Sequence, residues 1–94
     1  MKRAHRLAFN ALKKIGAPVY ERSDLENFQI SAEGLGSRSA YEGYKDYIMW
    51  ASFYEGPDIA HWEFGINPLI TDTLKRYGLH AEWINPAEIG VYND

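Results

Sequence analysis

The chain has 94 residues, of which 46% are hydrophobic and 24% are charged, and its formal net charge is −3. These values are typical of one globular domain and exclude a disordered chain or a long coiled coil. The sequence contains no cysteine, which excludes disulfides, thiol catalysis and metal sites with cysteine ligands. The longest apolar run, residues 47–51, is far too short to span a membrane, and no apolar segment typical of a secretion signal follows Met1. We therefore expect a single domain, residues 1–94, in the cytoplasm.

Basic side chains gather near the N-terminus. Residues 1–22 carry six lysine and arginine residues and one glutamate, whereas residues 23–94 carry four basic and twelve acidic residues. This asymmetry permits nucleic-acid binding through a basic helix, as one alternative function. The candidate residues are Lys2, Arg3, Arg6, Lys13 and Lys14. Because the chain as a whole is acidic, the outer face of a solvated helix is the stronger interpretation.

The N-terminal third predicts one helix and two strands. Apolar residues at helical spacing predict a helix over residues 2–15, which Gly16 ends. Short strands are predicted over residues 18–21 and 27–32, where apolar and polar residues alternate. His5 lies at the border of the apolar helix face, and we expect it on the surface.

The C-terminal third repeats this order. Asn67 and Pro68 are typical of a helix start, and Gly78 is the corresponding stop. Alternating apolar residues then predict strands over residues 79–84 and 89–92. Two such units predict a two-layer α+β fold, with a four-stranded, mainly antiparallel sheet and helices on one face.

Aromatic residues dominate the middle segment, residues 34–65. Rings recur at every third position, and we predict a helix over residues 40–53 and the order αββ–α–αββ. A strand over residues 47–54 is the alternative. Tyrosine and tryptophan are enriched at protein interfaces because they bury a large area with few rotatable bonds. We therefore predict a non-enzymatic surface that binds a protein or a second copy of the chain, the alternative being that these rings fill the core. The predicted contact residues are Tyr44, Tyr47, Trp50, Tyr54 and Trp62.

Two His-x-Glu pairs make a metal-dependent enzyme a further alternative. Residues i and i+2 of a strand point to the same face, so each pair offers one imidazole and one carboxylate to a divalent ion. The candidate ligands are His61, Glu63, His80 and Glu82. Plain solvent exposure explains the second pair equally simply. The sequence has no nucleophile or phosphate-loop motif, so we expect no cofactor and favour binding over catalysis.

Three stretches of the C-terminal third resemble one group of proteins. They are residues 64–68 (FGINP), 75–83 (KRYGLHAEW) and 90–92 (GVY). Together they resemble the C-terminal ends of small uncharacterised proteins of tailed bacteriophages. The resemblance implies expression in the cytoplasm of a bacterial host, and an accessory protein that binds a host or viral protein.

Overall fold

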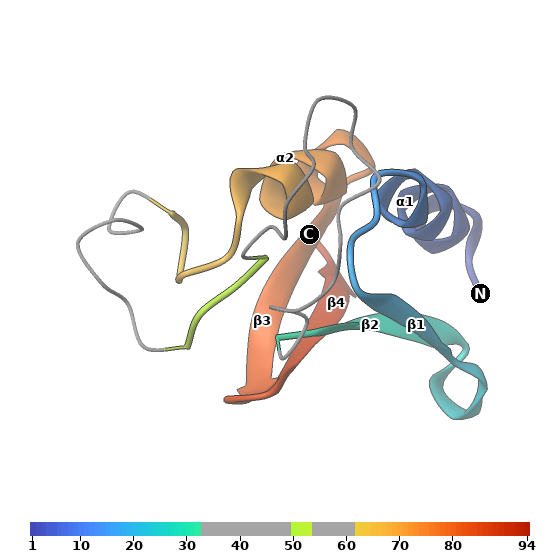
Figure 1. The fold of residues 1–94 in the computed structure, drawn as a ribbon. Coiled ribbons are helices and arrows are strands. Elements are labelled where there is room, and N and C mark those ends of the chain that lie inside the picture. Colours follow the sequence, from blue (N-terminus) through green and yellow to red (C-terminus); the bar gives the residue numbers. More distant parts are fainter. Residues whose placement is uncertain (33–49, 54–61) are drawn as a thin grey trace.

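The computed structural model describes residues 1–32, 50–53 and 62–94. Within these residues, two helices lie on a four-stranded antiparallel sheet (Figure 1). The helices are α1 (Arg3–Lys14) and α2 (Pro68–Arg76). The strands are β1 (Val19–Arg22), β2 (Asn27–Ser31), β3 (Leu79–Asn85) and β4 (Glu88–Asn93), and the short 3₁₀ helix η1 (Ser23–Leu25) joins β1 to β2. The predicted α+β class with an antiparallel sheet is thereby confirmed.

Helix α1 packs on the sheet through one apolar face. Its buried residues recur at helical spacing: His5, Ala8, Phe9 and Leu12. Beyond its end, Gly16 adopts a left-handed φ of 84°, a conformation that costs glycine little. The helix predicted over residues 2–15 is confirmed, with each end one residue shorter.

His5 is buried, with 6% of its surface exposed, which corrects the expectation of a surface position. The amide of Asn27 has a fixed orientation, because its Oδ1 accepts the N–H of Phe28 at 2.8 Å and its Nδ2 donates to the Val91 carbonyl at 2.9 Å. Nδ1 of His5 therefore donates to the same Oδ1, at 2.6 Å. Nε2 of His5 lies 3.0 Å from Oδ1 of Asn93. The two asparagines belong to β2 and β4, which are far from α1 in sequence. The residue pattern of α1 alone therefore could not predict that His5 is buried.

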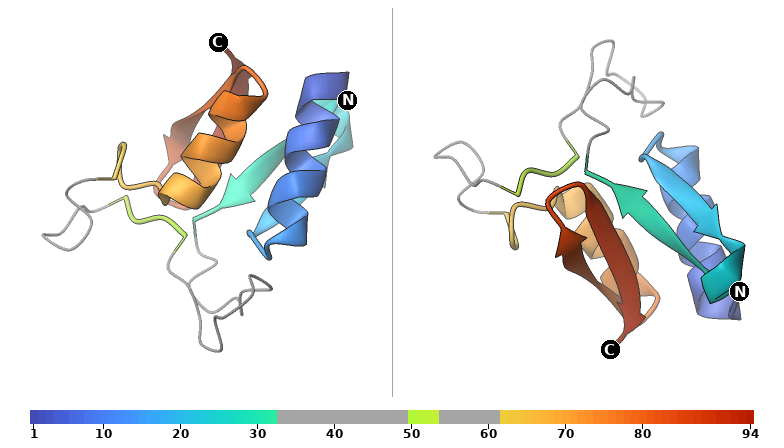
Figure 2. Two further views of the ribbon diagram at one scale, coloured as in Figure 1. Left: turned by 90° about the horizontal axis from the view of Figure 1, so that it is seen from above. Right: turned by 90° about the horizontal axis from the view of Figure 1, so that it is seen from below.

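The two helix–strand–strand units meet at the centre of the sheet, whose strand order is β1-β2-β4-β3. The inner strands, β2 and β4, pair antiparallel with Ile30 opposite Ile89. Each unit contributes one inner and one outer strand, so β1 and β3 form the two edges. Figure 2 shows both helices on the same face of the sheet.

The core lies between the helices and the sheet and draws on both units. Its largest fully buried side chains include Leu12, Phe28, Ile30, Ile70, Leu74, Leu79, Ile89 and Val91. The rings of Phe9 and Phe28 pack edge to face, with centroids 5.3 Å apart. Helix α2 begins as predicted: Oδ1 of Asn67 accepts the N–H of Leu69 at 2.9 Å, and Pro68 occupies the first turn.

Residues 50–53 are not helical, which corrects the part of the predicted middle helix that the structure describes. Ala51 instead forms an isolated antiparallel bridge with Ile66, and the N–H of Asn67 donates to the Trp50 carbonyl at 2.9 Å. These bonds fasten the segment to the chain that leads into α2. Trp50, predicted to lie on a binding surface, is consequently a core residue with 1% of its surface exposed.

Candidate protein interface

The outer edge of β3 presents the backbone N–H and C=O groups of every second residue. In β4, the carbonyl of Val91 faces β2, because it accepts Nδ2–H of Asn27 at 2.9 Å. In an antiparallel strand the N–H and C=O of one residue point to the same side, and the side alternates along the chain. Val91 is paired with Ala81 of β3, so this pair shares no backbone hydrogen bonds and the polar groups of Ala81 point outward. Because the direction alternates along the strand, the N–H and C=O groups of Leu79 and Trp83, two residues away on either side, also point outward.

The two edges of the sheet differ in how well they are protected. β1 has only four residues, it follows Pro18, and Nη1 of Arg6 in α1 donates to Oε1 of its Glu21 at 2.6 Å. Short strands, prolines and charges are the usual means of blunting an edge. β3 has seven residues, none of them proline or glycine. It also carries His80 and Glu82, which hydrogen-bond each other, and its register shift lies at its far end, between Trp83 and Asn85. In the part of the chain that the structure describes, no strand pairs with the outer side of β3, which leaves this edge open to another strand.

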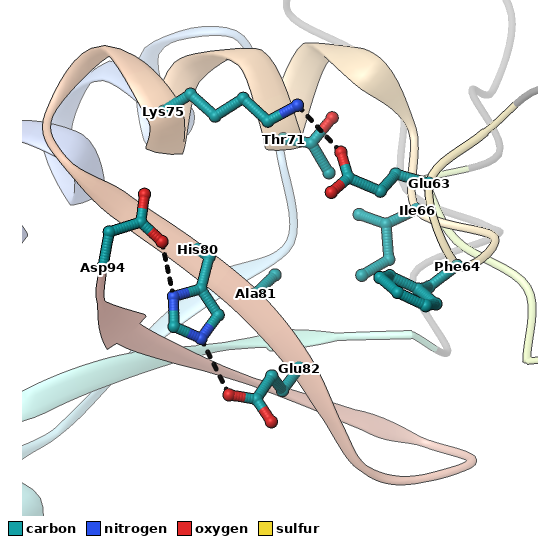
Figure 3. A pocket seen from close by; sticks show the side chains of 9 residues that line it. All are labelled: Glu63, Phe64, Ile66, Thr71, Lys75, His80, Ala81, Glu82 and Asp94. Carbon is teal, nitrogen blue, oxygen red and sulfur yellow. Dashed lines mark hydrogen bonds and ion pairs between the residues drawn. The ribbon is translucent and has the colours of Figure 1, made fainter.

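A hollow of about 380 Å³ follows the edge of β3 (Figure 3). Three successive residues of the strand line it: His80, Ala81 and Glu82. Successive side chains of a strand point to opposite faces, so a hollow that touches all three lies along the edge itself. Its other walls are α2, through Thr71 and Lys75, and the turn that precedes α2.

That turn displays a phenylalanine in a strained conformation. Glu63 and Ile66 are bridged, and the N–H of Ile66 donates to the Glu63 carbonyl at 3.0 Å. The two residues between them, Phe64 and Gly65, both have positive φ, 54° and 74°. Two-residue turns of this kind favour asparagine, aspartate and glycine, and a left-handed residue with a side chain costs roughly 1–2 kcal/mol. Phe64 is nevertheless 69% exposed, and strain kept at an exposed position makes this turn a candidate functional element.

Trp83 joins this turn to a second exposed ring. Its Nε1 donates to the carbonyl of Phe64 at 2.8 Å. Its indole packs edge to face with Phe53, with centroids 5.2 Å apart, and Phe53 is 44% exposed. The edge of β3 is therefore flanked by partly exposed aromatic residues that come from two other segments.

The charged groups of the hollow are paired with one another. Nε2 of His80 lies 2.7 Å from Oε2 of Glu82, and Nδ1 lies 2.8 Å from Oδ1 of Asp94. An ionised carboxylate only accepts hydrogen bonds, so a carboxylate at each ring nitrogen favours the protonated imidazole, in which both nitrogens donate. The Glu82 hydrogen bond, aided by Asp94, raises the pKa of His80 above its ordinary value. Nζ of Lys75 donates to Oε2 of Glu63 at 2.9 Å, which raises the pKa of Lys75.

The four residues predicted as metal ligands do not form a ligand set in the described structure. His80 and Glu82 hydrogen-bond each other, and Glu63 is bonded to Lys75. His61 lies outside the described residues. Across residues 1–32, 50–53 and 62–94, no group of three or more histidine, cysteine, aspartate or glutamate residues is placed to hold a metal ion.

The basic residues predicted to contact nucleic acid are all exposed on or next to α1: Lys2, Arg3, Arg6, Lys13 and Lys14. Two of them interact within the chain. Arg6 bonds Glu21, and both Arg6 and Lys13 lie over the ring of Phe9, 5.7 and 5.6 Å from its centroid. The face is therefore partly neutralised, and nucleic-acid binding stays a prediction.

Of the aromatic residues predicted to bind a partner, only Trp62 is described and partly exposed. Tyr44, Tyr47 and Tyr54 lie outside the described residues, and Trp50 is in the core. Neither Phe64 nor the outer edge of β3 was among the binding residues predicted from the sequence. One signal was available: Phe64 and Gly65 stand where a two-residue turn could form.

Comparison with known proteins finds no match, whether among protein-family models, curated proteins or solved structures. No helix within the described ranges is both long and apolar enough to cross a membrane. The fold defines a small α+β protein in which no strand from the described residues 1–32, 50–53 and 62–94 pairs with the outer edge of β3.

Proposed function

We propose that this protein is a small non-enzymatic interaction protein that binds an extended protein segment along the edge of β3. The observation that carries the proposal is the row of outward N–H and C=O groups at Leu79, Ala81 and Trp83. An added strand would satisfy these groups, and strand addition of this kind is a common mode of protein recognition. Side chains next to the edge would then select the partner.

The aromatic residues support the same surface. Phe53 and Phe64 both come from the aromatic segment predicted to bind a partner, residues 34–65, and both are exposed beside β3. Aromatic side chains are frequent hot spots because each buries a large area on binding.

The test is affinity capture from bacterial lysate with the tagged chain, run with and without nuclease treatment, followed by titration calorimetry with the purified captured protein. Two variants probe the edge. Ala81→Pro removes an outward donor that the sheet does not use, and Phe64→Asn removes the exposed ring. We expect at least tenfold weaker binding for each variant, with the fold checked by circular dichroism. The matched control, Arg3→Ala with Lys14→Ala on α1, should bind like the wild type.

Two outcomes contradict the proposal. Binding that both folded edge variants retain would place the interface elsewhere on the molecule. Recovery of nucleic acid alone, with an affinity that falls steeply with salt and is lost in the α1 double variant, would support the nucleic-acid alternative instead.

A further inference from the structure

We propose that the extended segment bound at this edge is β3 of a second copy, paired antiparallel about a two-fold axis at Ala81. This inference rests on the proposed function, because it uses the same edge and names its occupant. Two four-stranded sheets would then form one continuous sheet. The contact would be isologous, as in most symmetric dimers.

The backbone of β3 restricts the register of such a pair. Only outward-facing residues can exchange hydrogen bonds, so Leu79, Ala81 and Trp83 must lie opposite outward-facing residues of the second copy. An axis at Ala81 pairs all of them. Ala81 lies opposite Ala81 of the second copy, and Leu79 of each copy lies opposite Trp83 of the other. Each pair exchanges two bonds. An axis one residue away, at His80 or Glu82, leaves one fewer pair.

The charges on β3 select the same register. With the axis at Ala81, His80 lies opposite Glu82 of the second copy, twice by symmetry. Glu82 and Asp94 each lie within hydrogen-bond distance of one ring nitrogen of His80. When His80 is protonated, this cross-strand pair joins opposite charges, which stabilises a sheet. An axis at His80 or at Glu82 would instead place like charges directly opposite each other, which destabilises it.

The geometry of β3 also fits an axis at this position. The pairing of β3 with β4 is regular from Leu79 to Trp83 and shifts between Trp83 and Asn85. Ala81 is the middle residue of this regular stretch. The small alanine side chain leaves room for its symmetry mate beneath the helix layer.

The two-fold axis gives the exposed phenylalanine a contact. Phe64 lies beside Trp83, whose Nε1 donates to its carbonyl. Because Trp83 lies opposite Leu79 of the second copy, the ring of Phe64 would reach the Leu79 end of that strand. There the hollow is lined by Lys75 and Asp94. Each copy would thus place one aromatic ring in the hollow of the other, covering both.

Single-cysteine variants test the register directly, because the chain has no cysteine of its own. In the proposed pair the Cα atoms at position 81 are about 5.5 Å apart, which is within disulfide range. The matched control is Glu82→Cys, whose copies would be diagonal neighbours about 7–8 Å apart. Both variants are oxidised under identical conditions. We expect a disulfide-linked dimer from Ala81→Cys, forming at least tenfold faster than from Glu82→Cys.

Sedimentation velocity of the wild type over a hundredfold concentration range accompanies the cross-linking. We expect a concentration-dependent dimer that Ala81→Pro and Phe64→Asn each shift towards monomer by at least tenfold. A dimer that survives both variants, or that cross-links faster through position 82, would overturn the proposed pairing. A monomer throughout that still binds a captured protein through Ala81 would overturn the second copy as occupant and leave the proposed function standing. A monomer without such binding would overturn both.

Discussion

Trp50 has its ring in the core, and its indole nitrogen has no hydrogen-bond partner among the described residues. Its Nε1–H is buried and, in the part of the chain that the structure describes, donates to no acceptor. Leaving a buried donor unpaired costs roughly 1–3 kcal/mol. We expect Trp50→Phe to stay within about 1 kcal/mol of the wild type in urea unfolding, because relief of this cost offsets the lost volume. Trp50→Ala, which opens a cavity, should cost about 3–5 kcal/mol.

The control for this prediction is Trp83→Phe. That indole donates to the carbonyl of Phe64 at 2.8 Å, so its loss should cost about 0.5–1.5 kcal/mol. If Trp50→Phe destabilised the protein as much as Trp50→Ala, the unpaired indole nitrogen would not be a cost in the folded state.

His80 makes the stability of the protein depend on pH. Its folded-state pKa is raised above the ordinary 6.5, first by the hydrogen bond to Glu82 and further by Asp94. A raised pKa means that the pairing stabilises the fold fully below about pH 6.5 and that this contribution is lost as pH rises through the folded-state value. We expect the NMR titration midpoint of His80 to lie above 6.5 and to fall in Glu82→Gln. Glu63→Gln, which removes the partner of Lys75 instead, should leave the midpoint unchanged, and a wild-type midpoint at or below 6.5 would contradict the pairing.

At the scale of elements, we expect Phe64 in the turn before α2 to lower the stability of the fold while strengthening association. Asparagine suits the first position of a two-residue turn with positive φ, whereas Phe64 is strained there and mostly exposed. We expect Phe64→Asn to raise the free energy of unfolding by about 1 kcal/mol while weakening association. Gly65→Ala, at φ 74°, should instead lower it by about 1 kcal/mol. A destabilised Phe64→Asn variant would show that the ring is needed for the fold of the monomer.

Elements with clear end signals were the ones predictable from sequence. Gly16 and Asn67 mark helix boundaries by their own backbone and capping chemistry, so α1 and α2 lie within two residues of the prediction. The strands were predicted equally well from alternation. The conformation of residues 50–53 was not predicted correctly. A three-residue spacing of rings does not distinguish a helix from an extended segment, and the bridge of Ala51 to Ile66 fixes the extended one.

For the whole molecule, the strand order could not be predicted from local patterns. Both hairpins were expected, but the pairing of Ile30 with Ile89 joins residues far apart in sequence. This pairing decides that β3 is an edge, and it also decides that the N–H of Ala81 faces outward. The candidate interface therefore depends on long-range contacts, which is why the sequence analysis placed the surface on the aromatic rings alone.

The central pairing of β2 with β4 has a consequence for how the chain folds. The strands of each hairpin are joined by a short connection, so their pairing closes a short loop. The pairing of β2 with β4, at Ile30 and Ile89, closes a loop that spans most of the chain. Loop-closure entropy must be overcome before that ladder contributes any stability, and non-local pairing slows folding. We expect each helix–strand–strand unit to gain structure early and the docking of the two units to limit the folding rate. During that interval the edges of β2 and β4 that later face each other have no partner strand, so the newly made chain exposes these two strand edges as well as the outer edge of β3.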